Sequence, residues 1–583
     1  MSPAAFLRNA LRLLVPFAVI ITTYLYLYPV FLGCAFPLPD SQTTPTAFQS
    51  TVQQHLGNDD LSIAPFRLLA LGDPQLEGDT SLPDTYRVPF NHLKSFALNV
   101  AFQTSHSSLR ERIRQSLHDL VDLYFEDIPD AFESIRKRID LFGNDFYIAH
   151  IYRTLRWWTK PSHVTVLGDL LGSQWIGDEE FEKRSWRFWN RSFAGGERVP
   201  DEVAVHPAEE YELTGYLGNE GKNGTVWRKR IINIAGNHDV GYAGDMTVER
   251  LDRFEKAFGK AAYELRFELP ITNATLNATL LDTEKNPDSN RLPPEIRIVV
   301  INNMNLDTPA ITPELQDHTY TFVNDVINTA AAVEYKGHFT VVLTHIPMFK
   351  PEGVCVDAPF FDFFSSEEGG GVKEQYQLSA DASKGFLEGI YGIHRDVNAP
   401  GNGKGRSGII LNGHDHEGCD TFHFINQTAG ENMDDRNWEV VRWNEAEEKA
   451  IPEKYGHPGL REVTVRSMMG GYGGNAGLLS AWFDEEAWEW KYGFVNCALG
   501  KQYLWWFVHI FDLILVILIL AYPIFNALVT AGVVNDVWPD FIAARIGLQE
   551  TQQKPEKPAV SKDVTKEVSK DVKVANGETK TAS

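Results

Sequence analysis

The chain has 583 residues, of which 43% are hydrophobic and 23% charged. This composition supplies enough apolar side chains for a sizeable core and excludes a globally disordered protein. Acidic residues outnumber basic ones by 78 to 54, so the formal net charge is -24, which argues against a nucleic-acid-binding protein. Four cysteines are too few for a disulfide-rich scaffold or for a zinc site built from thiolates.

The first apolar segment, residues 13–33, has no formally charged residue. A helix of this length, at about 1.5 Å per residue, crosses a hydrocarbon core of about 30 Å, so we expect a transmembrane helix. A cleaved secretory signal is the alternative, but its apolar region is usually only about 7–15 residues long. Arg8 and Arg12 precede the segment, and the positive-inside rule therefore places residues 1–12 in the cytosol.

The second apolar segment, residues 503–534, contains one formally charged residue, Asp512. Its length favours a second transmembrane helix over a buried core helix, and Trp505 and Trp506 are typical of a membrane interface. Asp512 is then either a functional acid inside the membrane or a residue at the level of the head groups, about one turn from His509.

Two spans and a cytosolic N-terminus place the intervening chain in the lumen and residues 535–583 in the cytosol. After Gln549 this tail is a low-complexity mixture of Lys, Glu, Ser and Val without aromatic residues, which predicts disorder. We divide the lumenal part into a linker (34–65), a folded domain with insertions (66–480) and a juxtamembrane segment (481–502). Glycosylation triplets, which also arise by chance, all lie between the spans, at Asn190, Asn223, Asn273, Asn277 and Asn426.

A repeated pattern lies between the apolar segments, in which a short apolar run leads into a group of Gly, Asp, Asn or His. Such runs predict buried strands, and the ligands of α/β sheets collect at the carboxyl ends of strands. Five of these ends carry side chains able to bind metal ions: 66–71 before Asp73 and Gln75, 163–167 before Asp169, 231–235 before Asn237, His238 and Asp239, 339–343 before His345, and 408–411 before His414 and His416.

The residue types at these strand ends indicate a metal centre. Carboxylate, amide and imidazole groups without a thiolate suit hard or borderline divalent cations. A mixed set of this kind fits two ions about 3.5–4 Å apart that share a carboxylate. A single Gly-Asp after a strand is usually only a turn, but five such groups in chain order are difficult to explain as turns.

These strings resemble the motif blocks of the calcineurin-like metallophosphoesterase superfamily. The blocks are Gly-Asp-x-His, Gly-Asp-x-x-Asp, Gly-Asn-His-Asp/Glu, a lone His and Gly-His-x-His, and their counterparts occur here in this order over residues 72–416. The resemblance implies an α/β fold, a metallophosphoesterase β-sandwich flanked by helices (α/β/β/α), here lumenal and between two transmembrane helices. It also implies a dinuclear phosphoric diester hydrolase.

The same resemblance assigns a role to each site residue. His238 is expected to face the scissile phosphate as an acid or charge stabiliser, oriented by Asp239. The implied metal ligands are Asp73 and His416 for one ion, Asp169 as the bridge, and Asn237, His345 and His414 for the other ion.

Two positions depart from the family pattern. Gln75 stands where most members have a histidine ligand, and Gly172 stands where many have an acidic residue. Gln75 therefore either binds the first metal weakly through its amide oxygen or only hydrogen-bonds the ligands. We expect two divalent ions, manganese in the first place, with zinc or iron as alternatives.

These departures, together with residues 144–153 and 161–175, resemble fungal endoplasmic-reticulum phosphoesterases that remodel GPI anchors. The resemblance implies a lumenal phosphodiesterase that removes ethanolamine phosphate from a mannose of the GPI glycan, the second rather than the first, and so promotes ER-to-Golgi transport. It implies an ER membrane protein with both termini in the cytosol. GPI-anchored proteins as substrates, the bilayer and ER cargo receptors are the expected partners, without nucleic acid. A lumenal phosphodiesterase for another substrate and a non-catalytic cargo receptor for GPI-anchored proteins are the alternatives.

An apolar stripe within residues 106–140 predicts helices, because its members recur at helical spacing with charges between them. We expect this stripe to face the core rather than a lipid or a cofactor. Its members are Leu109, Ile113, Leu117, Leu120, Val121 and Tyr124.

Two of the four cysteines lie close in sequence to the predicted metal ligands. Cys355 follows the strand end at His345, and Cys419 follows His416, so both should lie near the predicted metal centre. An oxidising lumen permits a disulfide between them, and four free thiols are the alternative. Cys34 and Cys497 flank the apolar segments and are less suited to pair with either.

Overall fold

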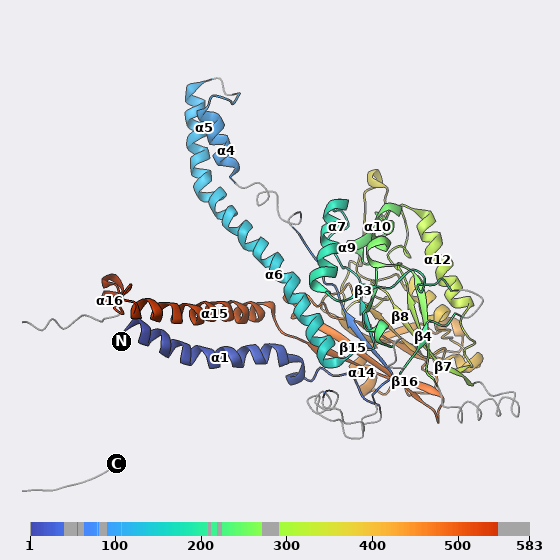
Figure 1. Ribbon diagram of the computed structural model, residues 1–583. Helices are drawn as coiled ribbons and strands as arrows, with labels where there is room; N and C mark the ends of the chain where they lie inside the picture. The colour runs from blue at the N-terminus through green and yellow to red at the C-terminus, as the bar shows by residue number, and fades with distance from the viewer. Residues whose placement is uncertain are drawn as a thin grey trace, which may run out of the picture. The chain divides into compact units, whose positions relative to one another are not determined.

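Two β-sheets with flanking helices form the centre of the protein (Figure 1). The computed structural model describes residues 2–39, 55, 63–78, 80, 90–105, 108–207, 212–218, 224–270 and 291–545. The chain separates into two units, residues 16–514 and a smaller one that combines residues 1–15 with the chain from 515 onward.

The first sheet has six strands, in the order β16 (Glu489–Ala498), β15 (Asn475–Asp484), β1 (Phe66–Leu71), β2 (His163–Val166), β5 (Arg230–Asn233) and β3 (Glu197–Arg198). β1, β2 and β5 run parallel, so their carboxyl ends reach the same edge. β15 and β16 pair antiparallel beside β1. The sheet therefore continues to Ala498, beyond residue 480, and most of the segment expected to be juxtamembrane is strand.

The second sheet has eight strands, in the order β13 (Trp438–Arg442), β12 (Cys419–Ile425), β14 (Gly459–Thr464), β11 (Gly408–Asn412), β8 (Lys336–Leu343), β7 (Arg291–Val300), β6 (Tyr263–Glu268) and β4 (Gly215–Tyr216). Its four central strands, β14, β11, β8 and β7, are parallel. A separate two-stranded ribbon consists of β9 (Phe361–Phe363) and β10 (Val372–Gln375). The parallel strands again bring several carboxyl ends to one edge.

Helices cover the outer faces of the two sheets (Figure 1). The longer ones are α6 (Ile128–Thr159), α7 (Asp178–Arg187), α10 (Val248–Phe258) and α12 (Pro313–Asn328). Their buried residues, among them Leu155, Phe181, Phe254 and Phe322, share one apolar cluster with the outward-facing residues of the strands. Shorter helices are α8 (Gly224–Trp227), α9 (Asn237–Val240), α13 (Ala380–Lys384) and α14 (Trp443–Glu448).

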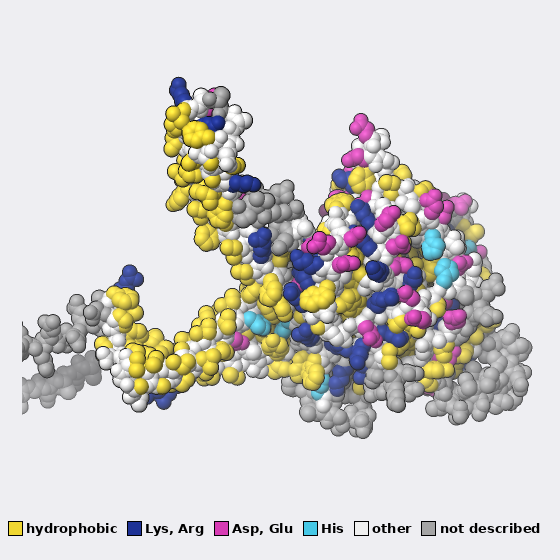
Figure 2. Space-filling view, turned by 45° about the horizontal axis from the view of Figure 1, so that its top comes forward, with side chains coloured by type: hydrophobic (Ala, Val, Ile, Leu, Met, Phe, Trp, Pro, Cys, Tyr) yellow, Lys and Arg dark blue, Asp and Glu magenta, His cyan; other side chains and the backbone are white. Residues whose placement is uncertain are grey.

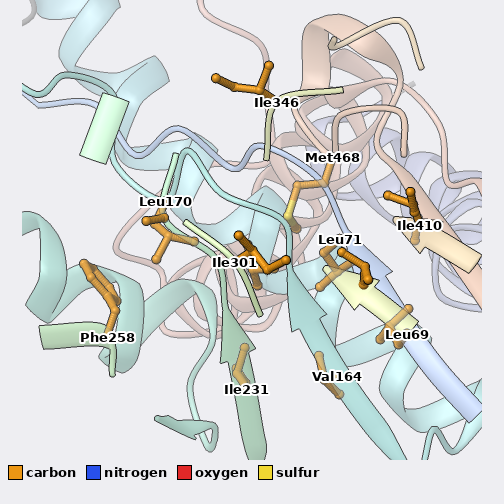
Figure 3. Packing of buried hydrophobic residues seen from close by; sticks show 14 of the residues in the cluster. Leu69, Leu71, Val164, Leu170, Ile231, Phe258, Ile301, Ile346, Ile410 and Met468 are labelled. Atoms are coloured by element: carbon orange, nitrogen blue, oxygen red, sulfur yellow. The ribbon is translucent and has the colours of Figure 1, made fainter. Parts of the chain in front are cut away.

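Strand residues alternate between two apolar layers, as the period of two in a strand requires. In β1, Leu68 and Ala70 belong to the cluster between the sheets, whereas Leu69 and Leu71 belong to the cluster beneath the helices. Figure 3 shows Leu69, Leu71 and neighbouring members of the cluster beneath the helices. Each fully buried Leu or Ile contributes about 1.5–3 kcal/mol relative to exposure. The arrangement fits the metallophosphoesterase sandwich that the sequence indicates.

In the described part of the chain, two helices are long and apolar enough to cross a membrane: α1 (Pro3–Phe31) and α15 (Gln502–Thr530). Within the larger unit they lie side by side, since Thr22 Oγ1 donates to Asp512 Oδ2 at 2.7 Å and the rings of Phe17 and Phe511 are 5.3 Å apart. Asp512 is thus hydrogen-bonded to the other helix. In the smaller unit, which includes α16 (Asp540–Arg545), Ala4 N donates to Asp536 Oδ1 at 2.8 Å.

A helical arm leaves the sandwich before β2. It consists of α4 (Asn91–Val100), α5 (Leu109–Asp122), the π-helical turn η2 (Leu123–Asp127) and the first part of α6. The helices within residues 106–140 are as predicted, but the expectation that their apolar stripe faces the core is wrong. Each of Leu109, Ile113, Leu117, Leu120, Val121 and Tyr124 is about half exposed or more. Helical spacing identifies an apolar face but cannot tell what covers that face.

Two disulfides join all four cysteines. Cys355 is bonded to Cys419, the pair that the sequence predicts. Their separation of 64 residues gives a stabilisation of about 4 kcal/mol in the chain-entropy model. Cys34 is bonded to Cys497, a pairing that the sequence analysis did not propose. The second bond ties the chain leaving α1 to the strand that leads into α15.

Candidate metal centre

The carboxyl ends of five strands from both sheets meet at one place. Asp73 follows β1, Asp169 follows β2, and Asn237 begins α9 after β5. His345 follows β8 of the second sheet, and the turn after β11 carries the remaining ligands, His414 and His416. Direct hydrogen bonds connect the two sheets here, since His414 N donates to Asp73 Oδ1 at 2.9 Å.

The described residues form two groups of potential metal-ligand atoms, each with its atoms within 4.8 Å of one another. One group contains Asp169, His345 and His414, and the other contains Asp73, Asp169 and His416. Asp169 is the member common to both, which is the position that a bridging carboxylate occupies in a two-ion site. Asn237 completes the first group, because its Oδ1 lies 3.0 Å from both His345 Nε2 and His414 Nδ1.

The backbone at the site is strained in a consistent way. Asp73, Gln75, Asp169 and His414 have φ angles of 45°, 39°, 50° and 73°, in the left-handed region that residues other than glycine rarely adopt. Such residues cost of order 1–3 kcal/mol each and cluster at functional sites. Gly168 is required for the same reason, with φ of 95° and an ideal Cβ only 2.2 Å from His345 Nδ1.

His345 is held in one orientation by main-chain and side-chain contacts. Its Nδ1 donates to Leu167 O at 2.7 Å, which leaves Nε2 directed at Asp169 Oδ1, 3.3 Å away. Asn303 supports the turn, because its Oδ1 accepts from His345 N and Ile346 N while its Nδ2 donates to Ile346 O. The sequence analysis missed Asn303. This residue closely follows the apolar end of β7 and so fits the same pattern, an apolar strand followed by polar residues.

His414 is oriented by the β9–β10 ribbon. Its Nε2 donates to Gln375 O at 2.8 Å, so Nδ1 faces Asn237 and the metal-ligand atoms. The side chain of Gln375 in turn donates to Asp307 Oδ2 at 2.8 Å. Hydrogen bonds of this kind fix the tautomer and direction of metal-binding imidazoles. No sequence signal could have identified Gln375, because it acts through its carbonyl group from a short insertion.

Gln75 lies at the centre, where the family pattern has histidine. Its Nε2 is 2.9 Å from Asp169 Oδ2 and 3.2 Å from His416 Nε2. The amide thus touches two predicted ligands, a geometry compatible with both roles considered for Gln75. His416 also packs edge-on against Tyr472, with ring centroids 4.8 Å apart, so the short helical turn η8 (Gly470–Tyr472) borders the site.

His238 has a partly exposed imidazole at the edge of the cluster, with its side chain 35% exposed. Its main-chain N donates to Asp169 Oδ1 at 2.9 Å, and its Nε2 lies 3.7 Å from Asp169 Oδ2. The expected orientation by Asp239 is wrong: within the described ranges, His238 Nδ1 has no hydrogen-bond partner.

Asp239 has a different function in the fold. Its carboxylate accepts hydrogen bonds from three main-chain N–H groups, those of Gly236, Leu170 and Leu171, at 3.0–3.1 Å. Both carboxylate oxygens are thus bonded to main-chain donors rather than to the imidazole of His238. Asp239 therefore ties the turn that carries Asp169 to the turn that carries Asn237.

The charges of the site fit bound cations. Burial raises the pKa of Asp73 to about 8, although His345 opposes this shift. Burial also opposes the charge of Asp169, but His238 and His345 outweigh it and hold the pKa of Asp169 below its usual range. His345 is buried as well, yet Asp169 and Asp73 raise its pKa to about 9. Asp73 Oδ2 has no hydrogen-bond partner among the described residues. All four observations indicate that positive charge is favoured between the carboxylates, as divalent ions would supply.

A buried ion pair supports the second-sheet side of the site. Glu462 Oε2 lies 2.8 Å from Lys350 Nζ and 2.7 Å from His423 Nε2. Its Oε1 accepts from Met348 N at 2.6 Å and from Asn412 Nδ2 at 2.7 Å. Glu462 therefore connects the loop after His345 to the end of β11, which carries the other histidine ligands. Sequence analysis did not identify this network, because its members come from strands without a shared motif.

The predicted glycosylation sites differ in their exposure where the structure describes them. Asn190 is exposed and its Nδ2 donates to Trp186 O, whereas Asn426 is half-buried. Asn223, Asn273 and Asn277 lie outside the described residues. Gly172, which stands where many family members have an acidic residue, lies against Glu77. An ideal Cβ on Gly172 would be 2.7 Å from Glu77 Cγ, so a side chain at this position would crowd Glu77.

Comparison with known proteins places the chain among metallophosphoesterases. It is 32% identical over 411 residues to Protein TED1 of Saccharomyces cerevisiae, which covers 64% of this chain and 76% of TED1. An uncharacterized protein of Schizosaccharomyces pombe is 26% identical over 392 residues (65% of this chain, 80% of that protein). Metallophosphoesterase 1 of Danio rerio is 21% identical over 290 residues (49% and 60%). No family model matches the chain. On the strength of the match to TED1, of the metallophosphoesterase relatives and of the shared motif order, this chain belongs to the calcineurin-like metallophosphoesterase superfamily, in the branch that contains Protein TED1.

Proposed function

We propose that this protein is a metal-dependent phosphodiesterase of the endoplasmic-reticulum lumen that removes the ethanolamine-phosphate side branch from a mannose of GPI anchors, the second mannose. The observation that carries the phosphoesterase part is the pair of metal-ligand groups that share Asp169. The relationship to proteins named metallophosphoesterase supports the same reaction class.

The side chains divide into two sets of metal ligands. Asp73, Asp169 and His416 would hold one ion, with Gln75 beside them, and the other ion would be held by Asp169, Asn237, His345 and His414. Two divalent ions, manganese in our proposal, would supply a nucleophile from water at neutral pH and neutralise charge on the phosphoryl oxygens. The protein itself fixes the positions of the ligands through strained turns and the bonds to Leu167 O and Gln375 O.

His238 is the residue that we assign to the substrate. Its partly exposed imidazole lies beside Asp169, it belongs to neither metal-ligand group, and its main-chain N donates to that carboxylate. An imidazole in this position can hold a proton for the alkoxide that leaves phosphorus, or stabilise charge on the phosphoryl group. Asp239 positions the turn on which His238 stands, through the bonds to Gly236, Leu170 and Leu171.

The proposed substrate rests on the resemblance of the motif blocks to fungal GPI-remodelling phosphoesterases and on the match to TED1. Two helices able to span a membrane suit a substrate that is itself anchored in lipid. The proposed partners are GPI-anchored proteins as substrates and ER cargo receptors, with the domain in the lumen and both termini in the cytosol.

The test uses the full-length protein purified in detergent. It is incubated with GPI glycans that carry ethanolamine phosphate on the first or on the second mannose, with and without manganese, and the products are identified by mass spectrometry. We expect metal-dependent loss of ethanolamine phosphate from the second mannose. Asp169→Asn serves as the matched inactive control.

Other outcomes separate the alternatives. Hydrolysis of bis-p-nitrophenyl phosphate without any action on GPI glycans would indicate a phosphodiesterase for another substrate. Binding of GPI-anchored proteins without hydrolysis of either compound would indicate a cargo receptor. Orientation is tested separately in cells: an endoglycosidase-sensitive mass shift that disappears in Asn190→Gln or Asn426→Gln would place the domain in the lumen.

A further inference from the structure

The arm exposes an apolar face that no described part of the chain covers. On α6 the stripe includes Phe132, Ile135, Ile139 and Phe142, at the spacing of one helix face. All four are more than half exposed, and Phe132 reaches 70%. Figure 2 shows the apolar side chains gathered along one edge of the arm, with charged groups elsewhere. An exposed apolar surface of this extent marks a contact with a partner or a membrane.

A few buried polar residues hold the helices of the arm together. Asp119 accepts hydrogen bonds from Ser95 Oγ and Asn99 Nδ2 of α4, at 3.0 and 2.8 Å. Asp127 accepts from His92 N and Leu93 N, two main-chain donors in the first turn of α4. Both aspartates are buried. The buried aspartates therefore fix which side of α5 faces inward and leave the apolar stripe on the outside of the arm, beside exposed charged residues such as Arg114 and Arg138.

The foot of the arm contacts the beginning of a candidate membrane span. An ideal Cβ on Gly143 would meet the ring of Trp506 at 1.8 Å, so α6 and α15 touch closely at this position. One turn further on, Tyr147 Oη donates to Gly500 O at 2.5 Å, and its ring lies 6.4 Å from that of Trp505. Trp505 and Trp506 are the residues expected at the membrane interface. The apolar face of the arm thus begins at Phe142, next to the level at which α15 enters the bilayer.

We propose that residues 91–105 and 108–142 form an interfacial arm that lies on the bilayer entered by α1 and α15, with its apolar face among the acyl chains beneath the head groups. Continuity with Trp505 and Trp506 identifies the membrane as the partner. The part of the arm from Leu109 to Phe142 is about 50 Å long at 1.5 Å per residue, which suits a plane rather than a pocket. The inward polar bonds leave the outer face suited to lipid, in the manner of monotopic helices. This inference does not depend on the substrate of the metal centre.

The test measures the depth of probes on the full-length protein. All four native cysteines form disulfides, so a single introduced thiol can be labelled with an environment-sensitive fluorophore. Phe132→Cys and Ile139→Cys place the probe on the apolar face. Lys137→Cys lies between them in sequence but on the opposite side of α6 and serves as the matched control. Each labelled protein is reconstituted into phosphatidylcholine vesicles. The fluorescence of the probe is then quenched either by aqueous iodide or by lipids with a doxyl group on the acyl chain.

A membrane-bound arm gives opposite results with the two quenchers. At positions 132 and 139, quenching by iodide should be at least about threefold weaker than at 137, because the apolar face lies about 5–10 Å below the polar surface. Doxyl lipids should quench the probes at 132 and 139 more strongly than the probe at 137. Equal quenching by iodide at all three positions would overturn the proposal. Protection from iodide without quenching by doxyl lipids would also overturn it, in favour of a second copy of the chain or another protein on this face.

Discussion

Replacing Lys350 by methionine should destabilise the folded protein strongly, because the substitution leaves the carboxylate of Glu462 buried without its cation. Glu462 and Lys350 are both almost inaccessible to solvent, and their charged atoms are 2.8 Å apart. Removing one partner of such a buried pair costs about 3–5 kcal/mol, since the remaining charge keeps its desolvation penalty. Neutralising the other partner in Lys350→Met/Glu462→Gln should recover part of that loss.

The measurement is the change in the free energy of unfolding of the full-length protein, by guanidinium titration in one detergent. The two single variants and the double variant form a mutant cycle, which isolates the interaction between the two side chains. Lys449→Met is the matched control, because the Lys449–Glu445 pair is solvent-exposed, and its loss should cost less than about 1 kcal/mol. A Lys350→Met protein as stable as this control, or strictly additive single losses, would refute the reasoning.

Titration gives the same pair a second signature. Burial opposes the charge of Glu462, but Lys350 and His423 outweigh burial and hold the pKa of Glu462 well below its usual range. A depressed carboxylate pKa stabilises the folded state above the unfolded-state pKa, about 4.3, and that contribution is lost as the pH falls. The stability difference between the native protein and Glu462→Gln should therefore be constant from pH 7 to about pH 5 and should narrow below about pH 4. A difference that grows on acidification would contradict this sign.

Three further predictions concern the metal centre. Asp169→Asn should abolish hydrolysis and lower the content of both ions, because both ligand groups contain this carboxylate; two tightly bound ions with normal turnover would exclude the bridging role. His238→Ala should slow turnover by roughly 10²–10⁴ with metal content unchanged if the imidazole acts as a general acid; elemental analysis that shows loss of metal would make His238 a ligand instead. Gln75→His should shift the metal preference from manganese towards zinc, since imidazole binds zinc better than an amide does; identical activation curves for the two ions would leave Gln75 with hydrogen bonding alone.

The strand-end pattern was sufficient to place the candidate site, and the reason is local. Residues next to the end of a parallel strand reach the edge of the sheet wherever the rest of the chain goes, so Asp73, Asp169 and His345 could be brought together from sequence alone. The predicted strands 66–71, 163–167 and 408–411 agree with β1, β2 and β11 within one residue. The near agreement follows because each run is bounded by glycine or polar residues that end the strand.

Features that depend on tertiary packing were not accessible in the same way. The apolar stripe of α5 would have the same spacing in sequence whether it faced the core or pointed outward. Only the burial of Asp119 and Asp127 shows which side of the helix faces inward. The error at Asp239 has a similar origin, because a side chain next to His238 in sequence can instead reach the main chain of another strand end. Gln375 acts through its carbonyl group, which any residue could supply.

The contacts at the centre also connect metal binding to the packing of the sandwich. The bond from His345 Nδ1 to Leu167 O and the bond from His414 N to Asp73 Oδ1 both cross from the second sheet to the first. The strained turns at Asp73 and Asp169 persist only because such bonds hold them. Ions shared by ligands from both sheets would add to the same connection, so part of the binding free energy would appear as stability of the sandwich. A substitution that removes a metal ligand should therefore loosen this edge of the fold as well as reduce activity, whereas loss of His238, which belongs to neither ligand group, should affect activity alone.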